Sequence, residues 1–253
     1  MGSARASRAL PSRAVIETEI AEAFEIVRGG ERSSLLLTCE HASERMPEPW
    51  RWPEEDRRLV GTHWAYDLGA AELTRELAAH TRSVGVLSRF SRLLVDPNRG
   101  EHEASLFRDV AEGQPVHLNA AVHGDEREQR LIRYYRPFHA AIDREVAATH
   151  AHTLLSVHSF TDLYEGQRRW LEVGILFDRE DELGAHLVGA FAAAGFHVAP
   201  NEPYSGKAGL IHSAATHAAP RGLRAVEIEV RQDLAVQASF RARVIDVLAR
   251  ALP

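Results

Sequence analysis

The chain has 253 residues, of which 45% are hydrophobic and 26% are charged, a balance typical of one globular domain rather than of a disordered or fibrous chain. Its 36 acidic residues outnumber its 30 Lys and Arg, so the net charge is −6 and no excess positive field is available to hold a phosphate backbone. No apolar run approaches the roughly 20 residues that cross a bilayer, and residues 1–14 lack the apolar stretch of a signal peptide, so we expect a cytoplasmic protein that binds neither nucleic acid nor membrane.

The N-terminal residues differ in character from the rest of the chain. Residues 1–30 open with an Arg- and Ser-rich stretch that has no stable period, which predicts a partly disordered arm. We expect residues 31–253 to form one domain that begins with a strand at 35–39. The single cysteine, Cys39, cannot form an internal disulfide and is predicted to be a buried thiol of that strand.

Strands and helices alternate along the rest of the chain. Helices are predicted over 66–80, 125–148 with an interruption near Pro137, 181–194 and 234–251, and strands over 84–87, 93–95, 153–157, 173–177 and 225–230. This alternation predicts an α/β fold of three layers, in which a mainly parallel or mixed sheet is flanked by helices on both faces.

Polar side chains gather where several predicted strands end. Three such clusters are CEHASE at 39–44, DPNRG at 96–100 and VHSF at 157–160. In open α/β sheets, functional groups collect beyond the carboxyl ends of the strands, so we expect these clusters to meet. Further along, Glu227 and Glu229 are separated by one apolar residue and should face the same side of their strand.

The clusters contain the donor types of a catalytic zinc site, which commonly uses two histidines and one carboxylate and leaves a position open for water. His41 and His158, each predicted to lie just past a strand, are the candidate histidines. Two residues compete for the carboxylate. Glu44 is favoured by its spacing from His41, whereas Asp67 is predicted to begin the next helix and could point back toward the same strand end.

Six motifs in this order resemble the N-formylglutamate amidohydrolase family over about residues 33–234. The motifs are CEHASERMP, THWAYDLGAAELTRELA, SRLLVDPNRG, LLSVHSF, NEPYSG and EIEVRQDL. The fold of this family is similar to that of zinc carboxypeptidases, so the resemblance implies a zinc-exopeptidase-like catalytic domain over residues 31–253. It also implies one Zn²⁺ per chain and a small-molecule N-acyl amino acid as substrate.

The resemblance assigns roles to individual residues. It implies that His41 and His158 bind zinc and that Glu229 is the general base. The family usually has Asn at the position of Glu44, whereas an Asp at the start of the next helix recurs, so Asp67 becomes the first choice and Glu44 the alternative.

Arginines and hydrogen-bonding residues near the motifs are candidates for contacts with substrate. Arg99, with Arg92 in reserve, is the candidate for stabilising the oxyanion of the tetrahedral intermediate. The candidates for binding the rest of the substrate are Asn98, Arg92, Arg168, Asn201, Tyr204 and Arg231.

Together these expectations describe a zinc-dependent hydrolase of a non-peptide acyl-amide bond, such as the conversion of N-formylglutamate to glutamate and formate. The same residues would serve a carboxypeptidase-like peptidase or a deacylase, which is the first alternative. A non-catalytic small-molecule binding protein that has kept the fold is the second. The sequence leaves the oligomeric state open.

Overall fold

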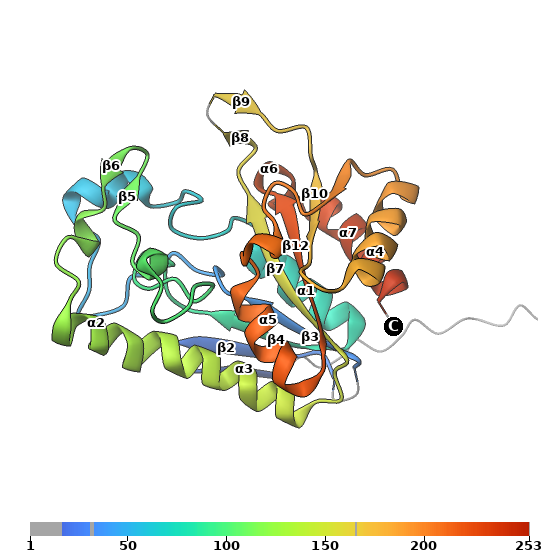
Figure 1. The fold of residues 1–253 in the computed structure, drawn as a ribbon, viewed down its shortest axis with the longest axis horizontal. Helices are drawn as coiled ribbons and strands as arrows, with labels where there is room; N and C mark the ends of the chain where they lie inside the picture. Colours follow the sequence, from blue (N-terminus) through green and yellow to red (C-terminus); the bar gives the residue numbers. More distant parts are fainter. Residues whose placement is uncertain (1–16, 31–32, 165, 253) are drawn as a thin grey trace, which may run out of the picture.

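The computed structural model describes residues 17–30, 33–164 and 166–252 (Figure 1). The helices are α1 Ala70–Thr81, α2 Gly124–Arg130, α3 Arg136–Ala148, α4 Asp181–Ala193, α5 His212–Ala218, α6 Gln232–Ala235 and α7 Ala238–Ala251. The strands are β1 Glu17–Ile20, β2 Phe24–Arg28, β3 Leu35–Cys39, β4 Val84–Ser88, β5 Val110–Ala111, β6 Gln114–Pro115, β7 Thr153–Phe160, β8 Leu163–Tyr164, β9 Gln167–Arg168, β10 Val173–Leu176, β11 Val198–Pro200 and β12 Arg224–Arg231.

Eight strands form one central sheet in the order β1-β2-β4-β3-β7-β12-β10-β11. Neighbours from β4 to β12 run parallel, as do β10 and β11, whereas β1 with β2, β2 with β4 and β12 with β10 are antiparallel. The sheet is therefore mixed, with a parallel centre, and the predicted α/β class is confirmed.

Helices cover both faces of this sheet and bury its apolar side chains (Figure 1). On one face, residues of α1, α4 and α7 pack against the strands around Leu155 and Ile228. On the other face, α3 and α5 pack against strand residues such as Leu36 and Leu154. The sheet thus forms the middle of three layers. Over the described residues, no helix combines the length and apolar character needed to cross a membrane.

Two predictions about the sheet need correction. We expected residues 1–30 to form an arm, but residues 17–28 form β1 and β2 and extend the sheet beyond β4, because Ile26 and Val27 bury against the domain. The remainder of that arm, residues 1–16, lies outside the described residues. The predicted strand over 93–95 is instead a buried turn, in which the Leu94 N–H donates to the carbonyl of Ser91.

Several element ends also differ from the sequence reading. The first long helix begins at Ala70 rather than near residue 66, and β7 continues through Phe160, so His158 lies within the strand rather than past it. Five residues of π-helix, Leu131–Tyr135, interrupt the long helix before Pro137, as the proline predicted. The C-terminal helix is divided into α6 and α7.

Candidate metal centre and active site

The central strands carry polar side chains toward the α3–α5 face of the sheet. In β12, Val226, Ile228 and Val230 face the opposite core, so Glu227 and Glu229 point together toward the site, as their alternation predicted. Glu229 is the cross-strand neighbour of His158 in β7. His41 follows β3, the strand on the other side of β7. Strand order therefore brings residues from three distant segments to one end of the sheet.

Asp67 reaches the site from the loop that precedes α1. Its N–H donates to the carbonyl of His41 at 2.9 Å, and its Oδ2 accepts from the Ser159 N–H at 3.2 Å. Gly69, at the N-cap of α1, has a φ of 82°, and a Cβ there would come within 2.4 Å of the backbone of Ala235. Glycine is therefore required for the turn that carries the chain from Asp67 into α1.

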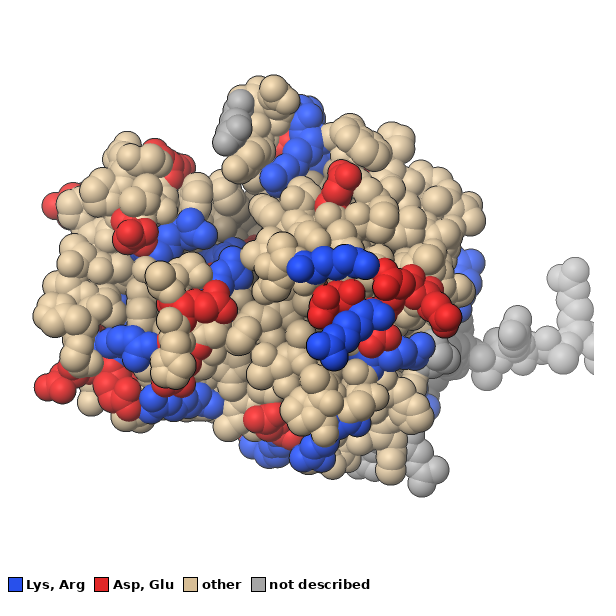
Figure 2. Space-filling view, viewed as in Figure 1, with Lys and Arg blue, Asp and Glu red and all other residues tan. Residues whose placement is uncertain are grey.

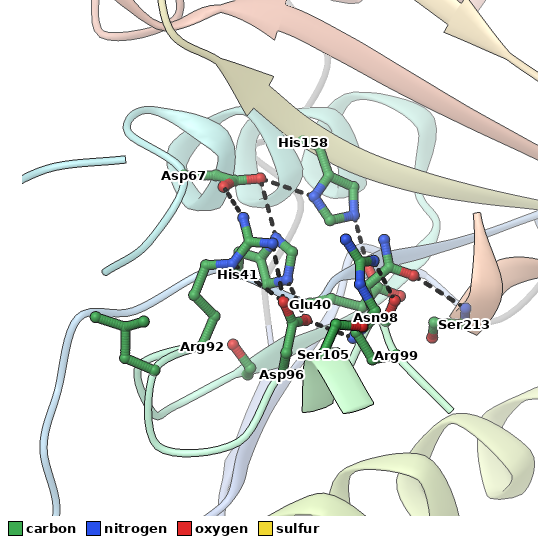
Figure 3. Close-up of polar contacts among 12 residues, drawn as sticks. Glu40, His41, Asp67, Arg92, Asp96, Asn98, Arg99, Ser105, His158 and Ser213 are labelled. Carbon is green, nitrogen blue, oxygen red and sulfur yellow. Dashed lines mark hydrogen bonds and ion pairs between the residues drawn. The ribbon is translucent and has the colours of Figure 1, made fainter. Parts of the chain in front are cut away.

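Three buried side chains, His41, Asp67 and His158, each offer a donor atom within 4.8 Å of the others (Figure 3). Asp67 Oδ2 lies 2.7 Å from His158 Nδ1 and 3.4 Å from His41 Nδ1. Among the described residues, His41 Nδ1 is buried without a hydrogen-bond partner. Zinc is commonly bound by two imidazole nitrogens and one carboxylate. Because these three groups lie together and one of the nitrogens has no hydrogen-bond partner in the described part of the chain, the residues fit a metal ion.

Each histidine also has a carboxylate at its other ring nitrogen. His41 Nε2 lies 2.7 Å from Asp96 Oδ1, and His158 Nε2 lies 3.1 Å from Glu40 Oε2. Glu40 Oε2 also accepts from the Ser156 hydroxyl at 2.6 Å. Metal-binding histidines usually donate their second N–H to such an acceptor, which orients the ring and raises its basicity. This arrangement supports the same fit.

The charges of the site shift the pKa values of its members. Burial lowers the pKa of His158, but Glu227 and hydrogen bonds to Asp67 and Glu40 outweigh it and raise the pKa well above its usual value. Burial likewise raises the pKa of Glu40, yet its hydrogen bonds with His158 and Ser156 hold it at about 2. The carboxylates of Asp67, Glu40 and Glu227 around His158 therefore favour positive charge at this point, which is the kind of charge that a metal ion would supply.

Glu227 and Glu229 differ in how they are held. Glu227 Oε2 lies 3.5 Å from His158 Nε2 and 3.4 Å from Asn98 Nδ2. Glu229 Oε2 is buried and, among the described residues, has no hydrogen-bond partner. Burial raises the pKa of Glu227 to about 7 and that of Glu229 well above its ordinary value. Of these two carboxyl groups, Glu229 is the one with an oxygen that no other described residue engages.

A cavity of about 640 Å³ opens onto these groups. Its lining includes the three candidate ligands, Glu229, Glu227 and four further predicted residues: Arg92, Asn98, Arg99 and Tyr204. Arg92 lies 2.9 Å from Asp96 and 3.5 Å from Asp67, and Asn98 Oδ1 accepts from the Ser213 N–H (Figure 3). The Asn98 Nδ2 donates to the carbonyl of Leu210. The cavity lies in the hollow seen in Figure 2, with β5–β6 and β8–β9 on opposite sides in Figure 1.

Other predicted site residues lie elsewhere. Glu44 Oε2 accepts from the Gly61 N–H at 2.6 Å and is not among the cavity-lining residues, so only Asp67 lies with both histidines. Arg168 is an exposed residue beside Asp233. Arg231 is held by Asp233 and three backbone carbonyls.

The Asn201 side chain also has a structural contact: its Oδ1 accepts from the Phe177 and Gly206 N–H groups. These contacts hold the loop that presents Tyr204 rather than a ligand. Asn201, Arg168 and Arg231 are all absent from the cavity lining. Asn201 and Arg231 therefore belong to motifs without reaching the cavity, and Arg168 lies outside both the motifs and the cavity.

The sequence reading did not single out Glu40, Asp96 or Arg108. Glu40 and Asp96 both lie within the quoted motifs, Glu40 directly before His41 and Asp96 at the start of Asp-Pro-Asn-Arg. The sequence does not indicate that Glu40 pairs with His158 or that Asp96 pairs with His41. Arg108 lies outside every motif, yet it lines the cavity with its guanidinium over the Trp64 ring. Nothing local in the sequence indicates that contact.

Comparisons with known proteins agree with this picture. A model of the N-formylglutamate amidohydrolase family matches residues 33–236. An N-formylglutamate deformylase of Pseudomonas putida is 29% identical over 131 residues. That match covers 46% of the chain and 46% of the relative, so the chain spans about half the length of the curated relative that it matches.

Two solved structures share the fold over most of their length. A gene product of Agrobacterium tumefaciens superposes with a TM-score of 0.84 at 30% identity, covering 92% of this chain and 94% of that chain. N-formylglutamate amidohydrolase from Ralstonia eutropha superposes with a TM-score of 0.65 at 21% identity, covering 91% and 97%. At the lower identity the likeness is one of fold alone.

Proposed function

Because the chain belongs to the N-formylglutamate amidohydrolase family, we propose that it is a zinc-dependent hydrolase of the acyl-amide bond of an N-acyl amino acid, such as N-formylglutamate. The observation that carries this proposal is the convergence of three buried metal-binding donors beside an unpartnered glutamate in one cavity. An acyl-amide hydrolase needs both parts, since one activates the carbonyl and the other manages the proton of water.

His41, Asp67 and His158 would hold the metal, with Asp96 and Glu40 orienting the two imidazoles. When bound, zinc supplies Lewis-acid polarisation of the amide carbonyl and of water. The donor atoms belong to a strand end, a loop and a strand interior. These are tied by hydrogen bonds from the Asp67 N–H to the His41 carbonyl and from the Ser159 N–H to the Asp67 carboxylate. The ligand set is therefore preorganised by the fold.

Glu229 is the proposed general base. Glu229 lines the cavity, and its Oε2 has no competing hydrogen bond among the described residues, so this carboxylate would accept a proton from the attacking water and return it to the leaving amine. Glu227 is less suited, because His158 and Asn98 already engage it. Arg99 is the proposed donor to the developing oxyanion, with Arg92 as the reserve that is partly neutralised by Asp96.

The decisive test is elemental analysis of the purified protein together with release of glutamate and formate from N-formylglutamate. We expect about one zinc per chain and turnover, and His158→Ala should lose both. His152→Ala is the matched control, because His152 is an exposed histidine next to the other end of the same strand. No bound metal after zinc is supplied would overturn the proposal, and cleavage confined to longer peptides would replace it with a peptidase.

A further inference from the structure

The cavity above the metal centre has two unlike walls. One is a cationic wall formed by Arg92, Arg99 and Arg108. The other is an apolar wall formed by Phe160, Leu163, Tyr164 and Tyr204. The candidate ligands and Glu229 belong to the same cavity lining. Arg108 lies just before β5, whereas Leu163 and Tyr164 form β8, and β5–β6 and β8–β9 stand on opposite sides of the site (Figure 1). A substrate whose amide reaches those groups therefore meets the Arg108 cation on one side and apolar surface on the other.

The three arginines of the cationic wall differ in how they are paired. Arg92 is paired with Asp96 and Asp67. Arg99 and Arg108, by contrast, form no ion pair with any residue in the part of the chain that the structure describes. The guanidinium of Arg108 lies 5.2 Å from the centre of the Trp64 ring, a contact that orients its donors without using them. Such a group binds a carboxylate well.

The apolar wall contains large hydrophobic side chains that are exposed to solvent. Leu163 and Tyr164 of β8 are 56% and 52% exposed, although they line the cavity. The guanidinium of Arg169 lies 5.5 Å from the Phe160 ring, 4.7 Å from the Tyr164 ring and 5.5 Å from the Tyr204 ring. One guanidinium thus packs against three rings of this wall. Large apolar side chains exposed around a cavity are typical of a binding surface.

The size of the cavity points in the same direction. Pockets of about 300–1,000 Å³ hold ligands of drug size, and this one measures about 640 Å³. N-Formylglutamate has only about a dozen non-hydrogen atoms, far fewer than such a ligand. Its formyl group has no methylene that could bury Leu163 or Tyr164. The apolar wall would stay in water with that substrate.

We propose that the substrate is an acidic amino acid carrying an apolar acyl group larger than formyl, with a carboxylate at Arg108 and the acyl chain against Leu163 and Tyr164. This inference rests on the proposed function. Water cleaves the amide C–N bond: the acyl carbon gains the hydroxyl, the nitrogen gains the proton, and the products are a fatty or aromatic acid and the free amino acid. No other reactant is needed.

The first experiment is a series of N-acyl-L-glutamates from formyl through acetyl and butyryl to hexanoyl, assayed by glutamate release with the zinc-loaded protein. The kcat/KM should rise about two- to fourfold for each methylene that the wall covers. A series of N-formyl amino acids with Glu, Leu and Phe is run beside it. If kcat/KM rises more from N-formyl-Glu to N-formyl-Leu or N-formyl-Phe than it does from formyl to hexanoyl on glutamate, the assignment of the apolar wall to the acyl group is wrong.

Variants localise the effect. Leu163→Ser and Tyr164→Ser should reduce the ratio of hexanoyl to formyl kcat/KM about fivefold or more, whereas Tyr164→Phe should keep it. Trp170→Ser is the matched control, because Trp170 is 62% exposed nearby but does not line the cavity. Near-UV circular dichroism verifies that each variant is folded. An unchanged ratio in folded serine variants would refute the apolar subsite.

The carboxylate anchor has its own pair of variants. Arg108→Gln should raise KM for N-acylglutamates at least about tenfold, and Arg168→Gln, which alters an exposed arginine outside the cavity, should not. Equal effects would refute the anchor. Failure of every acyl-glutamate, including formyl, would instead contradict the proposed function, whereas turnover of the formyl compound alone would overturn only this inference.

Discussion

The two faces of the central strands are both buried, yet they carry different kinds of residue. In β7, Leu155 and Val157 enter the core beneath α1 and α7, whereas Ser156 and His158 face the site. β12 repeats the pattern: the apolar residues face the core and the two glutamates face the cavity. A parallel strand buried on both sides can therefore assign stability to one face and chemistry to the other.

This division teaches that burial alone does not identify a core residue. His158 and Val157 are both almost completely inaccessible to solvent. The difference lies in their neighbours. Polar side chains on the site face, such as Ser156 and His158, form hydrogen bonds with other polar side chains of the site, and a few of the buried polar atoms there have no hydrogen-bond partner within the described ranges. Substitutions on the two faces should consequently affect different measurements.

The largest effect is expected on the site face. Glu229→Gln should lower kcat about a hundred- to ten-thousandfold, because an amide cannot accept the proton of water. Zinc content and the free energy of unfolding should stay near those of the native protein, since the substitution preserves the side-chain volume and Glu229 Oε2 has no hydrogen-bond partner among the described residues. Steady-state assays with elemental analysis and urea unfolding measure all three. Loss of zinc in this variant would mean that Glu229 is a ligand rather than the base.

The apolar face should respond in the opposite way. Leu155→Ala removes a fully buried side chain of the core beneath α1 and should lower the free energy of unfolding by about 2–5 kcal/mol. The folded fraction should retain its kcat, because Leu155 points away from the cavity. Urea unfolding and active-site-normalised assays test this separation. A large fall in kcat of the folded protein would break the division between the two faces.

A smaller effect is expected for a residue that contacts a metal ligand rather than the metal. Asp96→Asn weakens the acceptor of the His41 Nε2–H and the ion pair with Arg92, so zinc affinity should fall about 10–100-fold. Competition with a chromophoric chelator gives the dissociation constant. Asp109→Asn, an exposed aspartate in the same stretch of chain, is the control and should leave the affinity unchanged.

The smallest effect concerns a charge cluster outside the cavity. Burial raises the pKa of Glu145 in α3, but hydrogen bonds from Arg28 at 2.6 and 2.8 Å outweigh it and leave the pKa below its ordinary value. The unfolded chain therefore binds this proton more readily, so the contribution of Glu145 is present at neutral pH and is lost as pH falls through the folded-state pKa.

We expect this contribution to be about 1–2 kcal/mol, since Arg28 is partly exposed to water. Urea unfolding at neutral and acidic pH should give a difference between the native protein and Glu145→Gln that shrinks as pH falls. A difference independent of pH would contradict the ion-pair explanation and leave only packing.

Much of the site could be read from the sequence because its motifs end strands. The strands at 35–39 and 153–157 and the alternation of Glu227 with Glu229 are local patterns, and local sterics set which side chains share a face. The choice between Asp67 and Glu44 was different. It depends on which loop folds back over the strand end, and the contact of the Asp67 N–H with the His41 carbonyl joins segments that no periodicity relates.

Long-range contacts account for the remaining differences. Residues 17–28 read as part of an arm because they contain little to distinguish them, yet pairing with β4 makes them strands. Leu93–Val95 read as a strand, but buried turn contacts hold the segment instead. Arg231 lies within the EIEVRQDL motif and Arg168 lies outside the motifs, and both pair with Asp233, whereas Arg108, also outside the motifs, reaches the cavity.

By itself, the sequence determined the α/β class, the succession of the central helices and strands along the chain, and the types of side chain at the strand ends. It could do so because backbone periodicity and strand alternation act over a few residues. Tertiary structure alone decided which carboxylate joins the two histidines, which carboxylates orient them, and which arginines face the cavity. Those outcomes depend on strand order and loop packing, in which residues far apart in the chain compete for the same partner.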